Sequence, residues 1–155
     1  MDKTELLRQF EDTHAAMLDT LRQLDPERVI YEDTGWRVKD IVAHIATWDA
    51  ETLRSLHAFR RGGAYSIPNF YGTDDFNNFA ARARYMEPFE QILSEWEATR
   101  NWMLILLRAL TPEELTAEMT YPSGKTGLVG DLVQEIPDHE AEHLKPLRAV
   151  LERKT

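Results

Sequence analysis

Apolar residues recur at intervals of three and four residues through most of this chain, which is the spacing of one buried face of an α-helix. No stretch alternates apolar and polar residues for long enough to build a sheet. The chain is therefore predicted to be all-α, and four long amphipathic helices are typical of a four-helix bundle. The four predicted helices span residues 2–24, 38–61, 89–110 and 128–151.

The segments between the predicted helices differ in character. Residues 28–36 lack a helical period and are expected to be a connector, and residues 121–125 are expected to be an irregular crossing. Residues 62–75 carry three glycines, and residues 76–85 favour a short helix, so a long loop and a short helix are expected between the second and third long helices. A kink or break is expected near Pro137, because proline removes a backbone hydrogen bond from a helix interior.

Length and charge exclude several classes of protein. A chain of 155 residues is expected to form one domain, residues 1–155. Its 18 Lys and Arg against 27 Asp and Glu give a net charge of −9, which repels phosphate backbones and anionic lipid head groups. We therefore expect no nucleic acid and no membrane partner. The N-terminal residues lack the apolar region of a signal peptide, so a cytoplasmic location is expected.

The chain contains no cysteine, so any metal site must be built from histidines and carboxylates. His139 and His143 lie one helical turn apart on the same helix face, a spacing that suits two ligands of one ion. The surrounding string HEAEH also matches a metalloprotease motif, but no histidine follows His143 to serve as the third ligand. His44 lies between Ile41 and Trp48 on the apolar side of its predicted helix, so it is the candidate third ligand from a facing helix.

The remaining candidate site residues are less sharply indicated. His14 falls in line with Phe10 and is a candidate to line a pocket, although a packed or surface histidine is the simpler interpretation. Trp48 is expected to be part of the core or of a pocket wall. Glu140 flanks the histidine pair and is a third pocket candidate, but a solvated acidic helix face explains it more simply. His57 lies nearly opposite His44 on its helix and is expected to be exposed, and no catalytic residue is assigned.

The segment GWRVKDIVAHIATW, residues 35–48, resembles the DinB-like superfamily, in which a Trp-Ser-Val-x-Asp sequence opens the second helix and a histidine follows. The paired histidines of the last helix are a second point of resemblance. The glycine-rich loop after the second helix and the pair Phe76 and Asn77 are similar in particular to the ClbS/DfsB group. One departure is Arg37 in place of the serine that usually caps the second helix, so Thr34 or Asp33 is expected to accept hydrogen bonds there.

The resemblance covers nearly the whole chain and implies an up-down-down-up four-helix bundle that forms a homodimer. It also implies a divalent metal ion, nickel or zinc, as cofactor, with His44, His139 and His143 as the ligands when the family pattern is carried over by position. Some members of the ClbS/DfsB group lack the three histidines and work without metal.

Three functions follow as hypotheses. The first is a metal-dependent hydrolase or thiol S-transferase that acts on a small molecule in detoxification or stress response. The second is a non-catalytic, stress-associated bundle that binds a small molecule or a partner. The third is a metal-free hydrolase of the ClbS type, which would use His14 and a tyrosine from residues 65–71.

Overall fold

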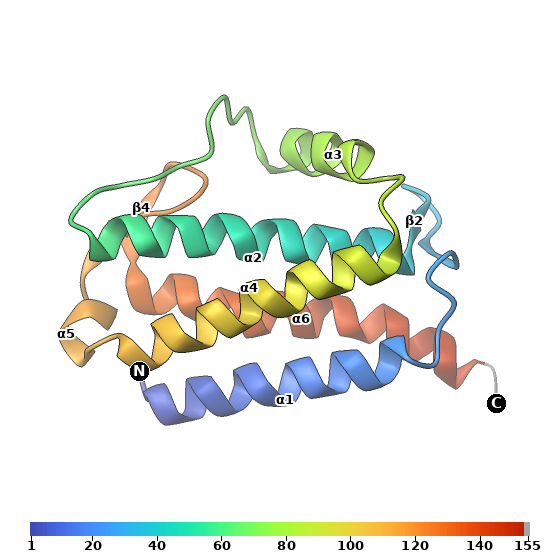
Figure 1. Ribbon diagram of the computed structural model, residues 1–155, viewed down its shortest axis with the longest axis horizontal. Coiled ribbons are helices and arrows are strands. Elements are labelled where there is room, and N and C mark those ends of the chain that lie inside the picture. The colour runs from blue at the N-terminus through green and yellow to red at the C-terminus, as the bar shows by residue number, and fades with distance from the viewer. Residues whose placement is uncertain (154–155) are drawn as a thin grey trace.

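The computed structural model describes residues 1–153, and four long helices packed side by side form its body (Figure 1). Helices α1 and α6 run in one direction and α2 and α4 in the other, so the predicted all-α, up-down-down-up four-helix bundle is confirmed. Helix α2 packs on both α4 and α6, while α1 packs mainly on α6. The bounds of these helices are Lys3–Leu21 for α1, Val38–Arg60 for α2, Phe89–Ala109 for α4 and Val129–Glu152 for α6.

The core of the bundle consists of two apolar clusters, one toward each end. One cluster is built around Ile45 and Trp96, and the other around Phe10 and Met103. In each long helix a polar or charged residue separates the two clusters along the chain. These four residues, which we call the polar layer, are His14, Asp49, Arg100 and Glu140.

Two small β-hairpins join the helices where the sequence indicated only connectors. Strands β1 (Val29–Tyr31) and β2 (Trp36–Arg37) pair antiparallel between α1 and α2. Strands β3 (Glu118–Thr120) and β4 (Thr126–Leu128) form the second hairpin after the short helix α5 (Pro112–Leu115). The expectation that no stretch is long enough to build a sheet is wrong for these two hairpins, because strands of two or three residues are too short to show an alternating pattern.

The start of α2 does not use the acceptors that the sequence suggested. Asp40, three residues into the helix, accepts a hydrogen bond from the backbone N–H of Arg37 at 2.9 Å, so the expectation of Thr34 or Asp33 is wrong. The N–H groups of Val38 and Lys39 donate instead to backbone carbonyls of the preceding segment. The segment between α1 and β1 thus satisfies donors that a serine cap would otherwise have to satisfy.

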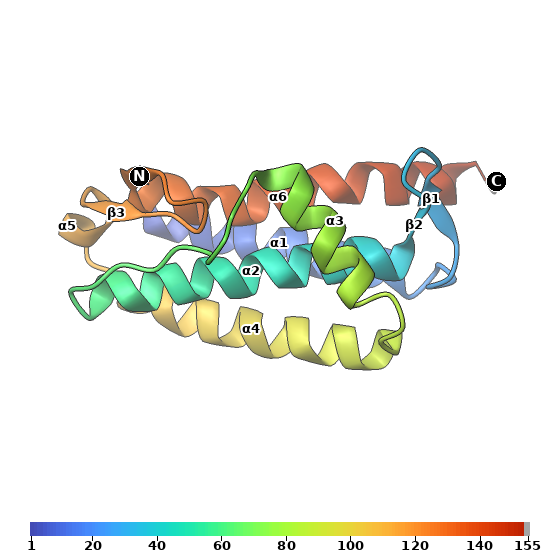
Figure 2. The same cartoon turned by 90° about the horizontal axis from the view of Figure 1, so that it is seen from above.

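The long connection between α2 and α4 crosses the outside of the bundle. It contains the predicted short helix, α3 (Thr73–Ala83), which begins three residues earlier than the sequence suggested. Seen from above, α3 lies obliquely over α2, on which it packs (Figure 2).

Helix α6 runs without interruption through both Pro137 and Pro146, so the predicted break does not occur. Burial of α6 against α1 and α2 offsets the lost backbone hydrogen bonds. No helix within residues 1–153 combines the length and the apolar content needed to cross a membrane.

Candidate metal centre

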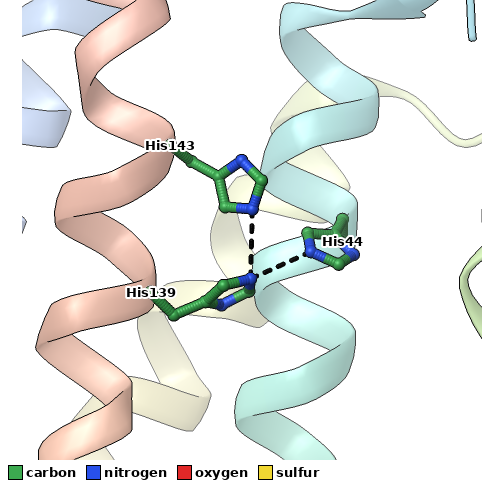
Figure 3. A group of neighbouring side chains, drawn as sticks. All are labelled: His44, His139 and His143. Atoms are coloured by element: carbon green, nitrogen blue, oxygen red, sulfur yellow. Dashed lines mark hydrogen bonds between the residues drawn. The ribbon is translucent and has the colours of Figure 1, made fainter. Parts of the chain in front are cut away.

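Three histidine side chains meet between α2 and α6, and we call them the histidine cluster. Nε2 of His139 lies 3.0 Å from Nε2 of His44 and 3.1 Å from Nε2 of His143. Figure 3 shows all three rings turned toward one another in the space between the two helices. One potential ligand atom from each residue lies within 4.8 Å of the other two. The structure thus brings together the three residues that the sequence proposed as ligands.

The imidazoles of the histidine cluster are neutral at pH 7. Burial, followed by the nearby His139 and His143 rings, lowers the pKa of His44 to about 3. Burial and the neighbouring His143 lower the pKa of His139 to about 4, although Glu142 and Glu140 oppose this change. Burial also lowers the pKa of His143. Neutral imidazole is the form in which histidine binds a metal ion.

Hydrogen bonds alone cannot satisfy all three rings of the histidine cluster, because Nε2 of His139 faces two other ring nitrogens. A neutral ring nitrogen carries either one proton or one lone pair, so His139 can make one well-formed hydrogen bond here and not two. A cation between the rings would use a lone pair from each of them. Three histidine nitrogens without a thiolate are a donor set that nickel and zinc accept, so the residues present fit a divalent metal ion.

Tyr31 fixes the orientation of one ring. Its hydroxyl lies 2.8 Å from Nδ1 of His143, on the opposite side of the ring from the cluster. When Nδ1 carries the proton and donates it to the Tyr31 oxygen, Nε2 keeps its lone pair toward His139. Tyr31 belongs to β1, and nothing in the sequence distinguishes it from the other tyrosines, so the sequence analysis missed it.

A cavity of about 630 Å³ adjoins the histidine cluster. Its walls come from α2, α3 and α6 and from the turn between β3 and β4. Trp48, a predicted pocket residue, lines the cavity, and its indole N–H donates to Asn77 Oδ1 on α3 at 2.7 Å. The lining residues are His44, Trp48, Asp49, Thr52, Thr73, Asn77, Tyr121, Pro122, Ser123, Lys125, Thr126, Leu132, Glu135, Ile136, Asp138, His139 and Glu142.

The other two pocket candidates, His14 and Glu140, lie outside the lining of this cavity. Glu140 is completely buried, so its interpretation as part of a solvated acidic face is wrong. The next residue on a helix points about 100° away, so Glu140 faces α1 and α4 while His139 faces α2. Arg100 Nη1 donates to Glu140 Oε2 at 2.6 Å, and His14 Nδ1 lies 3.3 Å from Oε1. His57 is exposed, as predicted.

Two charged residues of the polar layer were not singled out from the sequence. Asp49 and Arg100 both occupy inward positions of apolar stripes, and a charge at such a position is the signal that could have identified them. Asp49 lines the cavity, and its Oδ2 accepts a hydrogen bond from the Trp96 indole N–H at 2.9 Å. Burial raises the pKa of Asp49 to about 7, while Arg100 lowers it and Glu140 raises it further.

Comparison with known proteins identifies the family to which the sequence is similar. The sequence model of the DinB superfamily matches residues 9–146. A comparison with curated proteins found no match.

Three solved structures are similar in fold. The colibactin self-resistance protein ClbS, in complex with double-stranded DNA, aligns with a TM-score of 0.79 and 13% identity over 97% of this chain and 95% of that one. A protein from Escherichia coli UTI89 aligns with a TM-score of 0.78 and 15% identity over 98% and 94% of the two chains. A mycothiol-dependent maleylpyruvate isomerase aligns with a TM-score of 0.76 and 14% identity over 95% of this chain and 61% of that one. Identities this low show a shared fold alone.

Proposed function

Because this chain belongs to the DinB superfamily, we propose that it is an enzyme that acts on a small molecule with a divalent metal ion held by His44, His139 and His143. The observation that supports this proposal is the meeting of three neutral imidazoles beside a cavity that His44 and His139 line. The cavity, at about 630 Å³, is of a size that accommodates a small organic molecule. We expect nickel or zinc as the ion.

The residues around the cluster would each have a defined task. When bound, a divalent ion with three histidine ligands keeps open coordination positions and supplies Lewis acidity. Tyr31 holds the His143 ring in place through Nδ1. Asn77 holds the Trp48 indole as a fixed wall beside His44. The rings of Phe70 and Phe76 pack on Trp48 at centroid distances of 6.3 Å and 5.1 Å and help to hold the indole in place.

Hydrolysis is the reaction class that we favour. Four carboxylates line the cavity, and they would repel the thiolate that a thiol transfer requires as well as any carboxylates on the thiol itself. Transfer of a low-molecular-weight thiol is the second candidate, because the mycothiol-dependent isomerase shares the fold over 95% of this chain. A role in detoxification or stress response suits either reaction, and the name of ClbS as a self-resistance protein agrees with it.

The two other hypotheses lose specific support. A metal-free hydrolase of the ClbS type was expected to use His14, which lies outside the cavity lining, and Tyr65, whose hydroxyl donates to Glu51 at 2.6 Å. A non-catalytic bundle would need the histidine cluster to be satisfied by hydrogen bonds alone, and His139 cannot pair well with both neighbours.

ClbS, which shares this fold, was solved in complex with double-stranded DNA. The fold therefore does not by itself argue against a DNA partner. The net charge of −9 does, and we keep the proposal that this chain acts without nucleic acid. A cytoplasmic location and a homodimer also stay predictions, and light scattering would test the second.

The decisive experiment is elemental analysis of the purified protein and of two matched variants. We expect close to one nickel or zinc ion per chain in the wild type and in His57→Ala, which changes an exposed histidine outside the cluster. We expect the ion to be lost in His139→Ala. Equal metal content in His57→Ala and His139→Ala would overturn the assignment of the histidine cluster as the metal site.

The reaction class is tested with the same three proteins. Hydrolysis of small esters and amides should occur with the wild type and with His57→Ala, stop with chelator, return with added metal and be absent in His139→Ala. Consumption of a low-molecular-weight thiol under those conditions, with no hydrolysis, would favour the transferase instead.

A further inference from the structure

The cavity beside the histidine cluster carries a strong excess of negative charge. Its lining contains four carboxylates and a single cationic side chain, that of Lys125. Within residues 1–153, none of these four carboxylates forms a salt bridge with lysine or arginine. The four residues, which we call the acidic wall, are Asp49, Glu135, Asp138 and Glu142.

Asp49 differs from the other buried charged residues. Lys39, Asp40, Glu51, Arg100 and Glu140 are buried, and each of them has a salt-bridge partner. Asp49 is 4% exposed and, in the described part of the chain, has no salt bridge. Trp96 donates to Oδ2, whereas Oδ1 has no hydrogen-bond partner among the described residues and belongs to a side chain that lines the cavity. Arg100 is the nearby cation, but it compensates the charge of Asp49 only in part because Glu140 opposes it. A further cation inside the cavity would therefore stabilise this buried carboxylate.

The arrangement of the acidic wall favours an organic cation over a second metal ion. Within residues 1–153, the one group of three potential ligand atoms close enough to share an ion is the histidine cluster. The cavity also offers aromatic surface from Trp48 and Tyr121. Aromatic faces attract ammonium and guanidinium groups through cation–π interactions.

We propose that this cavity selects small molecules that carry a protonated amine or guanidinium group, which pairs with Asp49. The inference rests on the proposed function and names its substrate class. Asp49 follows His44 by five residues on α2, which separates the two by about 7.5 Å along the helix axis. They are also about 140° apart around the helix, but both line the cavity. The cation of the substrate therefore lies a few bonds away from the group that reacts at the histidine cluster.

Three indoles that differ in charge provide the test. Tryptamine is cationic, tryptophol is neutral and indole-3-propionate is anionic, while their size and aromatic surface are similar. Isothermal titration calorimetry at pH 7.5 should show tryptamine binding at least tenfold more tightly than either of the others. Equal affinities, or a preference for the propionate, would overturn the proposal.

The role of Asp49 is tested with a matched pair of variants. Asp49→Asn is nearly isosteric and should lower tryptamine affinity about tenfold, to the level of tryptophol. Asp19→Asn makes the same change at an exposed position of α1 outside the cavity lining, and it should leave tryptamine affinity unchanged. Unchanged preference for the cation in Asp49→Asn, with circular dichroism showing a folded protein, would remove Asp49 from the site.

Each titration is run on chelator-treated protein and on protein reloaded with nickel or zinc. Cation preference without metal uptake would leave this inference standing and overturn the metal site. Metal uptake without cation preference would leave the metal site standing and overturn this inference.

Discussion

Arg100 on α4 donates to Glu140 on α6 across the centre of the bundle, with Nη1 2.6 Å from Oε2. Glu140 follows His139 directly in the chain, so the same turn of α6 carries a ligand candidate on one face and a buried charge pair on another. The polar layer and the histidine cluster are therefore connected through this turn of α6. Substitutions in the polar layer are expected to affect the histidine cluster.

Breaking this pair should destabilise the protein strongly. Arg100→Met leaves the carboxylate of Glu140 buried without its cation, which costs about 3–5 kcal/mol in typical cases. Combining it with Glu140→Gln removes the stranded charge, so the double variant should lose less stability than the sum of the single variants. Urea unfolding measures all three free energies. Arg108→Met, at an exposed ion pair, is the control and should change stability by less than about 0.5 kcal/mol.

Removing the Tyr31 hydroxyl should weaken metal binding without abolishing it. Tyr31→Phe frees Nδ1 of His143 and the orientation of that ring, and loss of such an outer partner lowers metal affinity about 10–100-fold. Competition with a chromogenic chelator measures the affinity. Tyr71→Phe, at a largely exposed tyrosine, should match the wild type. Equal affinity in both variants would show that the Tyr31 contact does not support the site.

The metal-free protein should lose stability as the pH falls from about 6.5 toward 4. The pKa values of His44 and His139 lie below the unfolded value in the native state, so the unfolded chain binds protons first. Each of these residues should cost about 2 kcal/mol of stability by pH 5 relative to pH 8. Urea unfolding at both pH values measures the change, and His44→Gln should show a smaller loss. The same slope in the variant would contradict a neutral, buried His44.

Asp49 should have the opposite pH dependence. Its native pKa, about 7, lies above the unfolded value of 3.8, so its contribution to stability is present at low pH and is lost as the pH rises through 7. Asp49→Asn keeps an acceptor for Trp96 and removes the buried charge, which Arg100 only partly compensates and Glu140 opposes. The variant should therefore be more stable than the wild type at pH 8, by at most about 4 kcal/mol, and similar to it near pH 4. A stability difference that does not change with pH would refute this.

Some features of this structure can be predicted from the sequence alone, because they depend on residues that are close together in the chain. The spacing of Leu6, Phe10 and Met17 predicts the helix that contains them and the face that it buries. The placement of His139 and His143 on one helix face is likewise local, because a helix brings residues four apart together wherever it packs. The resemblance at residues 35–48 identified the family that the superfamily model then matched.

Other features depend on how the helices lie against one another. His44 meets the histidine pair only because α2 and α6 pack in a register that brings residue 44 beside residues 139 and 143, and that register results from many small contacts along both helices. In the same way, the arrangement of α4 and α6 in the bundle brings Glu140 to Arg100, and the packing of β1 on α6 brings Tyr31 to His143. The sequence by itself thus determined four amphipathic helices and two paired histidines. Tertiary packing alone decided which side chains share a site, because no local pattern encodes the register between distant helices.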